Sequence, residues 1–268
     1  METNNYYIYG VNGPVITVRG GRSLPMMSLV YVGNVRIPGE VVSASGNTTI
    51  VQVYEDSAGL SKDQPVFPTD KPMSVLLGPG MLSNIYDGIA RPLRRIAEMA
   101  GSFIAKGITL PALDMEKLWD VKLDAKEGMD ASGGMIFART QESDAIEHRS
   151  MVPPDLQGKF TEVKPDGQYK VTDVLAYIVD ERGKKYPLTL AQEWPIRRSR
   201  PCAKRLPITR PLVTGQRVID TLFPVGKGGC AAIPGPFGAG KTMVQHQLAK
   251  WSDADIIVYL GCGERGNE

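Results

Sequence analysis

The stretch Gly235-Pro236-Phe237-Gly238-Ala239-Gly240-Lys241-Thr242 fits the pattern G-x-x-x-x-G-K-[ST], which is typical of loops that wrap the phosphates of a nucleotide. Glycines in such a loop allow backbone N–H groups to turn inward onto the phosphates. Lys241 is expected to neutralise charge on the β- and γ-phosphates, and Thr242 to offer its hydroxyl to Mg²⁺. The stretch 235–242 therefore predicts a site for ATP or ADP with Mg²⁺.

The residues on both sides of the loop predict a strand before it and a helix after it. The short apolar run 229–233 is expected to form a buried strand, and Val244 and Leu248 recur at helical spacing. A continuous apolar run, 255–260, then predicts a second strand that is buried on both faces. A right-handed βαβ crossover makes two such strands parallel, so the segment 261–268 would emerge at the same sheet edge as the phosphate loop.

The segment 261–268 supplies a candidate catalytic carboxylate. Gly261 and Gly263 bring the backbone close, and Glu264 would then point toward the γ-phosphate, where a water must be oriented for in-line attack. The alternative is a surface turn in which Glu264 and Arg265 form a solvated pair. Loops at this edge of a sheet usually carry function, which favours the catalytic interpretation.

Length and composition limit the classes of protein to consider. A chain of 268 residues is long enough for two or three domains. Lys and Arg total 31 against 29 Asp and Glu, so the net charge of +2 gives no broad field for nucleic acid, and no nucleic-acid partner is expected. Three cysteines without a C-x-x-C pair favour a reducing compartment, hence the cytoplasm. No apolar run is long enough to span a bilayer, so any membrane role would go through partners.

The first part of the chain predicts a small β-barrel. Short β-rich runs at 15–18, 29–32 and 49–54 alternate with turns rich in Gly, Pro and Asn, which favours an antiparallel barrel over residues 1–72. A connecting segment, 73–110, follows it. Apolar residues recur there at helical spacing from Ile85 through Ile89 and Leu93 to Ile96, which predicts a helix that leads out of the barrel.

The remainder predicts an inserted domain and a nucleotide-binding domain. Residues 111–190 return to short strands separated by Gly and Pro, as expected of an inserted β-rich domain. Residues 191–268 are predicted to be the first part of the nucleotide-binding domain. The basic stretch Arg197-Arg198-Ser199-Arg200 could contact phosphate or an acidic partner, but the interleaved prolines that follow favour a solvated linker.

The chain resembles the catalytic A subunits of V-type and archaeal A-type rotary ATPases along nearly its whole length. The resemblance is carried by the phosphate loop together with Val11-Asn12-Gly13-Pro14, Gln52-Val53-Tyr54-Glu55, Leu77-Gly78-Pro79-Gly80, Tyr86-Asp87-Gly88-Ile89, Leu110-Pro111-Ala112-Leu113-Asp114, Thr214-Gly215-Gln216-Arg217-Val218-Ile219-Asp220, Gln245-His246-Gln247-Leu248-Ala249-Lys250-Trp251 and 261–268. It implies an α/β fold with a β-rich N-terminal part: a barrel, an inserted bulge domain and the start of a RecA-like P-loop NTPase core. It also implies that Glu264 is the catalytic carboxylate, with Lys241, and that Arg265 lies beside the nucleotide.

The same resemblance implies partners. In that family three A subunits alternate with three B subunits in a ring, the nucleotide lies at the A/B boundary, and B supplies an arginine to the γ-phosphate in trans. Central and peripheral stalk subunits connect the ring to a membrane rotor that moves H⁺ or Na⁺. The implied function is ATP hydrolysis or synthesis coupled to ion transport, at the cytoplasmic side of a membrane and held there through partner subunits.

Family members continue for about as many residues again, with the acidic strand that completes Mg²⁺ coordination and the adenine pocket. The chain is therefore expected to be an N-terminal fragment with a truncated nucleotide-binding domain that would bind phosphates weakly and be inactive alone. One rival is another RecA-like ring motor, such as an F-type β subunit or a flagellar export ATPase; the long insert and the sequence around Glu264 argue against it. The other is a non-catalytic nucleotide-binding or assembly subunit of such a ring, which Lys241 disfavours.

Overall fold

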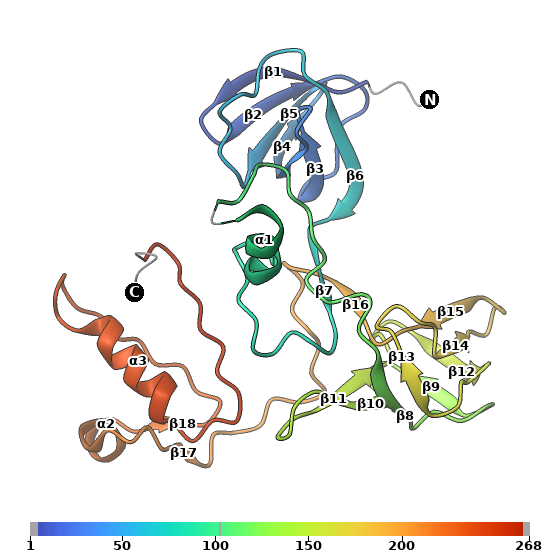
Figure 1. Cartoon of the computed structure of the whole chain (residues 1–268), viewed down its shortest axis with the longest axis vertical. Coiled ribbons are helices and arrows are strands. Elements are labelled where there is room, and N and C mark those ends of the chain that lie inside the picture. The colour runs from blue at the N-terminus through green and yellow to red at the C-terminus, as the bar shows by residue number, and fades with distance from the viewer. Residues whose placement is uncertain (1–4, 102, 265–268) are drawn as a thin grey trace. The chain divides into compact units, whose positions relative to one another are not determined.

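The computed structural model describes residues 5–101 and 103–264, which form two compact units, Met1–Arg200 and Pro201–Glu268 (Figure 1). In the first unit the strands are β1 Tyr7–Asn12, β2 Val15–Arg19, β3 Ser28–Val32, β4 Ile37–Ser45, β5 Thr48–Val53, β6 Val66–Pro72, β7 Ser74–Leu77, β8 Trp119–Leu123, β9 Asp130–Ser132, β10 Ile136–Gln141, β11 Glu147–Met151, β12 Gln157–Thr161, β13 Gly167–Tyr169, β14 Ala176–Val179, β15 Lys185–Leu188 and β16 Gln192–Pro195; its helix is α1 Leu93–Ala100. The second unit has β17 Pro211–Leu212, α2 Arg217–Leu222, β18 Val225–Gly226 and α3 Lys241–Trp251.

The first six strands form the predicted barrel. They make one antiparallel sheet in the order β1-β2-β5-β4-β3-β6, and β1 meets the chain before β6 through the Tyr7–Pro65 bridge. Alternate residues of β2, such as Ile16 and Val18, point inward and are buried, while their neighbours are more exposed. This alternation is the pattern from which the strands were predicted, and it gives the barrel its own apolar core.

The connecting helix is shorter than predicted. Helix α1 begins only at Leu93, and Ile85, predicted to lie on its apolar face, is exposed in the turns before it. Pro92 is the cause, because the residue before a proline is disfavoured in helical conformation. The Asp87 carboxylate stabilises the turn instead, since it accepts hydrogen bonds from the N–H groups of Ile89 and Arg91 at 3.1 and 2.8 Å.

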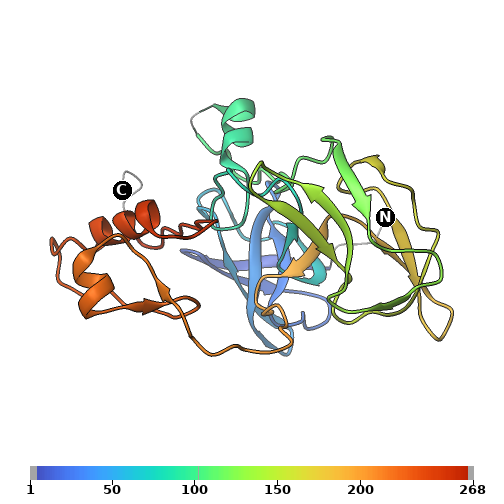
Figure 2. The same ribbon diagram turned by 90° about the horizontal axis from the view of Figure 1, so that it is seen from below.

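The predicted inserted β domain consists of two four-stranded antiparallel sheets, visible in Figures 1 and 2. Their orders are β11-β10-β8-β13 and β15-β14-β12-β9. Side chains from both sheets fill one core, in which Phe137 and Phe160 are the largest of those that are almost completely buried. The chain enters and leaves this domain side by side, because β7 pairs with β16.

The second unit differs from the first because its described residues form almost no buried core. Within its described residues no apolar side chain is buried, and the eleven residues of α3 include none that is. The predicted strands at 229–233 and 255–260 are wrong for this structure, since neither segment has strand character. A strand exists only where a neighbour accepts and donates its backbone hydrogen bonds, and the described part of this unit provides no such neighbour for either run. In the described residues no helix is both long and apolar enough to cross a bilayer.

The inserted domain should depend on its aromatic core. Replacing Phe160, which is 0% exposed, by Ala should lower the free energy of unfolding by about 3–5 kcal/mol, because it removes buried apolar surface and leaves a cavity. The measurement is denaturant unfolding followed by circular dichroism. Phe103→Ala is the control, since Phe103 is 86% exposed and should change stability little; equal losses for both variants would contradict the assigned core.

Candidate phosphate-binding site

The phosphate loop has the backbone geometry that its glycines were predicted to provide. Gly238 and Gly240 adopt φ of +79° and +83°, in the left-handed region that residues with a Cβ rarely occupy. Gly240 is also the N-cap residue of α3, with ψ of 17°. The loop thereby turns directly into the helix, and Lys241 and Thr242 become its first residues.

The start of α3 presents unused hydrogen-bond donors. The first helical bond runs from the N–H of Val244 to the carbonyl of Gly240, at 3.0 Å. The N–H groups of Lys241, Thr242 and Met243 have no acceptor among the described residues, as is usual for the first turn of a helix. Such donors, together with the positive end of the helix dipole, favour a bound anion such as phosphate.

Lys241 lies folded over the loop. Its Nζ donates a hydrogen bond to the carbonyl oxygen of Gly235 at 2.7 Å, so the ammonium group lies above the start of the loop. A Cβ on Gly235 would come within 3.2 Å of the Cβ of Ala239, and the two arms of the loop are thus closely apposed. The positive charge, the free N–H groups and the adjacent Thr242 hydroxyl fit the phosphates and the cation of a magnesium nucleotide.

Two carboxylates hold the segments around α2 and α3 together. Asp220 of α2 accepts hydrogen bonds from the N–H and hydroxyl of Thr214 at 2.9 and 2.7 Å, and these bonds lower the pKa of its carboxyl. Asp253, just after α3, pairs with Lys227 at 2.7 Å and accepts from the N–H of Val213 at 3.1 Å, and the Lys227 contact lowers its pKa. Both groups are ionised at neutral pH: Asp220 fixes the turn before α2, and Asp253 attaches the C-terminal end of α3 to the segments around Val213 and Lys227.

The candidate catalytic carboxylate, Glu264, is not held in position by contacts in the described part of the chain as the phosphate loop is. Glu264 is exposed and makes no hydrogen bond or ion pair to the described residues, and Arg265 lies outside them. The run that leads to Glu264 does return along α3, because the rings of His246 and Tyr259 lie 5.5 Å apart at a tilt of 49°. The structure therefore brings Gly235, Ala239 and Lys241 together, and it gives no contact between Lys241 and Glu264.

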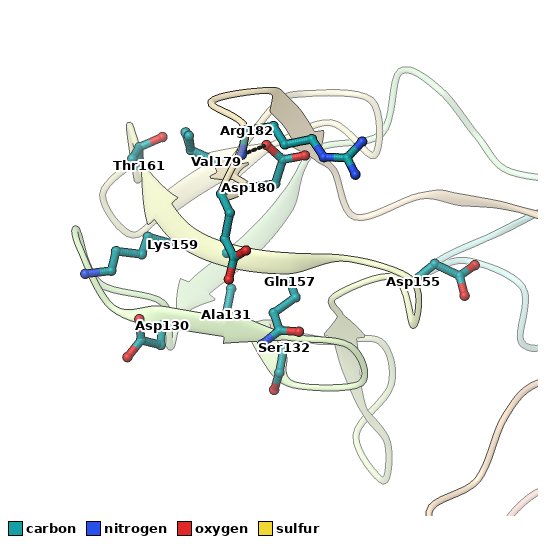
Figure 3. A pocket seen from close by; sticks show the side chains of 12 residues that line it. Asp130, Ala131, Ser132, Asp155, Gln157, Lys159, Thr161, Val179, Asp180 and Arg182 are labelled. Carbon is teal, nitrogen blue, oxygen red and sulfur yellow. Dashed lines mark hydrogen bonds between the residues drawn. The ribbon is translucent and has the colours of Figure 1, made fainter.

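A hollow of about 810 Å³ lies on the inserted domain and not at the phosphate loop. Figure 3 shows its lining side chains on β9 and β12 and at the turn after β14, where the Arg182 N–H donates to Asp180. Its lining has more carboxylates than cations: Asp130, Asp155, Asp180 and Glu181 against Lys159 and Arg182. An excess of negative charge repels nucleotide phosphates, so this hollow is not the nucleotide site.

Three family models match successive parts of the chain. They are the "ATP synthase alpha/beta family, beta-barrel domain" over residues 8–70, the "ATPsynthase alpha/beta subunit barrel-sandwich domain" over 110–197 and the "ATP synthase alpha/beta family, nucleotide-binding domain" over 215–268. The chain belongs to the ATP synthase alpha/beta family. These matches confirm the predicted fold class of the family: a barrel, an inserted β-rich domain and the start of a RecA-like nucleotide-binding core.

Curated members of this family match almost the whole chain. It is 52% identical over 258 residues to the V-type ATP synthase alpha chain of Halothermothrix orenii, covering 96% of this chain and 44% of that protein. It is 50% identical over 261 residues to the A subunit of the A-type ATP synthase of Methanosarcina barkeri, covering 97% and 44%. The predicted resemblance to the A subunits is thus confirmed, and the chain spans less than half the length of these relatives.

A solved structure agrees on the fold. The assembled ATPase EscN of the enteropathogenic E. coli type III secretion system matches 98% of this chain and 42% of its own, with a TM-score of 0.53. Its sequence identity is 17%, so the match supports the shared architecture of the family alone.

The loop glycine at the start of α3 offers a test of this geometry. Gly240→Ala should cost about 1–2 kcal/mol, because a residue with a Cβ is strained at φ of +83° although nothing lies within 4 Å of the added atom. The amide of Val244, which bonds to Gly240, should then exchange with solvent about tenfold faster, as read by hydrogen exchange. Gly261→Ala is the control, since Gly261 has neither a positive φ nor a neighbour within 4 Å; unchanged exchange in Gly240→Ala would refute the assigned loop.

Proposed function

We propose that this chain forms the barrel, inserted domain and first part of the nucleotide-binding domain of the catalytic A subunit of a V/A-type rotary ATPase. The complete enzyme would couple ATP hydrolysis or synthesis to transport of H⁺ or Na⁺. The observation that carries the proposal is the phosphate loop, closed by Lys241 at the start of α3, in a chain 52% identical to a V-type ATP synthase alpha chain. The domain boundaries at 72, 110 and 190 belong to the same proposal.

Each proposed site residue has a distinct role. The backbone N–H groups of 235–242 would surround the β- and γ-phosphates, and the Nζ of Lys241 would leave the Gly235 carbonyl for the phosphate oxygens, which carry more negative charge. The hydroxyl of Thr242 would bind Mg²⁺, which commonly takes few protein ligands and several phosphate or water oxygens. Glu264 would orient the attacking water, and Arg265 would contact the nucleotide.

The exposed apolar surface of the second unit supports a site completed by further protein. Val258 and Leu260 are 79% and 85% exposed, and the run that contains them lacks strand partners within the described residues. Apolar runs of this kind are typical of central strands in parallel sheets. If further protein covered the run and paired with its backbone, the segment that carries Glu264 would be held in place. We therefore assign activity to the full-length subunit within its ring, with the B subunit supplying an arginine in trans and stalk subunits linking the ring to the membrane rotor.

Removing the loop lysine should abolish turnover. Lys241→Ala in the assembled ring should lower kcat for ATP hydrolysis by at least about 10²–10³-fold, because the transferring phosphoryl group loses a cation that stabilises its charge. Steady-state ATPase assays of the ring give the measurement. Lys250→Ala, on the exposed end of the same helix, is the matched control and should keep wild-type turnover; unchanged activity in Lys241→Ala would sink the proposal.

Replacing the proposed catalytic carboxylate should separate binding from chemistry. Glu264→Gln keeps the size of the side chain but removes the charge that orients water, so nucleotide affinity should stay within about twofold while kcat falls at least about 10²-fold. Nucleotide binding is followed by equilibrium titration and turnover by ATPase assay. Glu181→Gln on the inserted domain is the control. A parallel loss of binding and turnover in Glu264→Gln would make Glu264 structural.

A further inference from the structure

A buried carboxylate of the barrel binds the basic stretch that was predicted to be a solvated linker. Glu40 of β4 is 2% exposed, and Arg197 approaches it as a fork, with Nε 2.9 Å from Oε1 and Nη2 2.5 Å from Oε2. The hydroxyl of Tyr54 donates to Oε2 at 2.7 Å. These contacts, led by the hydrogen bonds from Arg197, hold the pKa of Glu40 below its usual range despite burial, which acts to raise it.

The next arginine binds the inserted domain. Arg198 pairs with Asp155 at 2.9 Å, and its backbone carbonyl accepts a 2.6 Å hydrogen bond from Nε1 of Trp194, a buried residue of β16. Arg200 lies over the same indole ring, 4.4 Å from its centre. Consecutive arginines therefore face in two directions: Arg197 to the barrel and Arg198 to the insert.

The segment that leads from the barrel to the inserted domain, residues 73–110, is the outgoing limb of the chain. It is attached to the barrel at Glu55, the residue next to Tyr54. Glu55, which follows Tyr54, pairs with Arg91 at 2.5 Å and accepts a hydrogen bond from the N–H of Gly107 at 2.8 Å. Arg91 pairs in turn with Asp87 at 2.7 Å, and the Arg91 and Glu55 side chains are only 11% and 8% exposed. The limb that leads to the insert is thus held at the same end of β5 as the limb that returns from it.

We propose that Tyr54 and Glu55, with the buried carboxylate of Glu40, form a double clasp that joins barrel and inserted domain into one mechanical unit. The clasp attaches the segment before the insert through Arg91 and the segment after it through Arg197. The strands that enter and leave the insert, β7 and β16, also pair with each other. Movement of the insert is then transmitted to the barrel and is not absorbed by bending of the limbs. Removing one partner of a buried ion pair leaves an uncompensated charge, so the clasp resists partial opening.

The test is residue-resolved native-state hydrogen exchange on the whole chain at increasing low denaturant. Barrel-core amides such as Val30 and Val51 and insert-core amides such as Phe160 and Ile178 report the opening of each domain separately. In the wild type both sets should exchange through one cooperative opening with the same denaturant dependence. In the double variant Glu40→Gln/Glu55→Gln, one set should exchange at least about tenfold faster than the other, with a smaller denaturant slope.

The control variant is Glu162→Gln, which breaks the ion pair with Lys185 inside the insert and should leave the two sets coupled. Arg197→Ala tests the same clasp from its exposed side, since the Arg197 side chain is 55% exposed, and should separate the two sets without altering either core. Separate openings in the wild type, or a shared opening in both clasp variants, would overturn the proposal.

Discussion

The arrangement of the first 200 residues depends on the buried carboxylate of Glu40. Burying the charge of Glu40 in the barrel wall is unfavourable unless it is paired and hydrogen-bonded, and Arg197 and Tyr54 together satisfy it. Arg197 follows the inserted domain in the sequence, so the buried charge of the barrel is satisfied by the segment of chain that returns from that domain. The ion pair thus attaches the segment after the inserted domain to the barrel, although each of the two domains has its own apolar core.

In the second unit, the phosphate loop is shaped by contacts within a few residues, and the described residues of that unit show no buried ion pair like that of Glu40. Positive φ at Gly238 and Gly240, a helix that starts at Lys241 and the bond from Lys241 Nζ to the Gly235 carbonyl shape the phosphate loop. The segment toward Glu264 is different, because a strand acquires its direction from the strands beside it. A phosphate loop can therefore be formed within this chain, whereas the water-orienting part of the proposed site requires further protein surface around it.

How much the sequence could predict follows from the range of the interactions involved. The barrel strands and the phosphate loop were predictable, since alternation of apolar residues and glycines at fixed spacing act over a few residues. The helix expected from Ile85 failed on a local rule that was overlooked, the effect of Pro92 on the residue before it. The strands at 229–233 and 255–260 failed because apolar runs reveal a preference for burial and not the presence of a partner.

The role of Arg197 could not be predicted from spacing, because Glu40 lies 157 residues away in the chain. The one signal available was the charge of Glu40 inside the otherwise apolar start of β4, which indicated that a partner had to exist without saying where. The resemblance to the A subunits supplied what local patterns could not, namely the order of barrel, insert and nucleotide-binding domain, and the family matches confirm that order.

The central claim is that the phosphate loop and the Glu264 carboxylate face one nucleotide. The most direct measurement is a structure of the assembled ring with Mg²⁺ and a non-hydrolysable ATP analogue. We expect Lys241 Nζ within hydrogen-bonding distance of the γ-phosphate, and the Glu264 carboxylate linked to the same phosphate through one water. A bound nucleotide with Glu264 on the opposite side of the sheet from Lys241 would contradict the account.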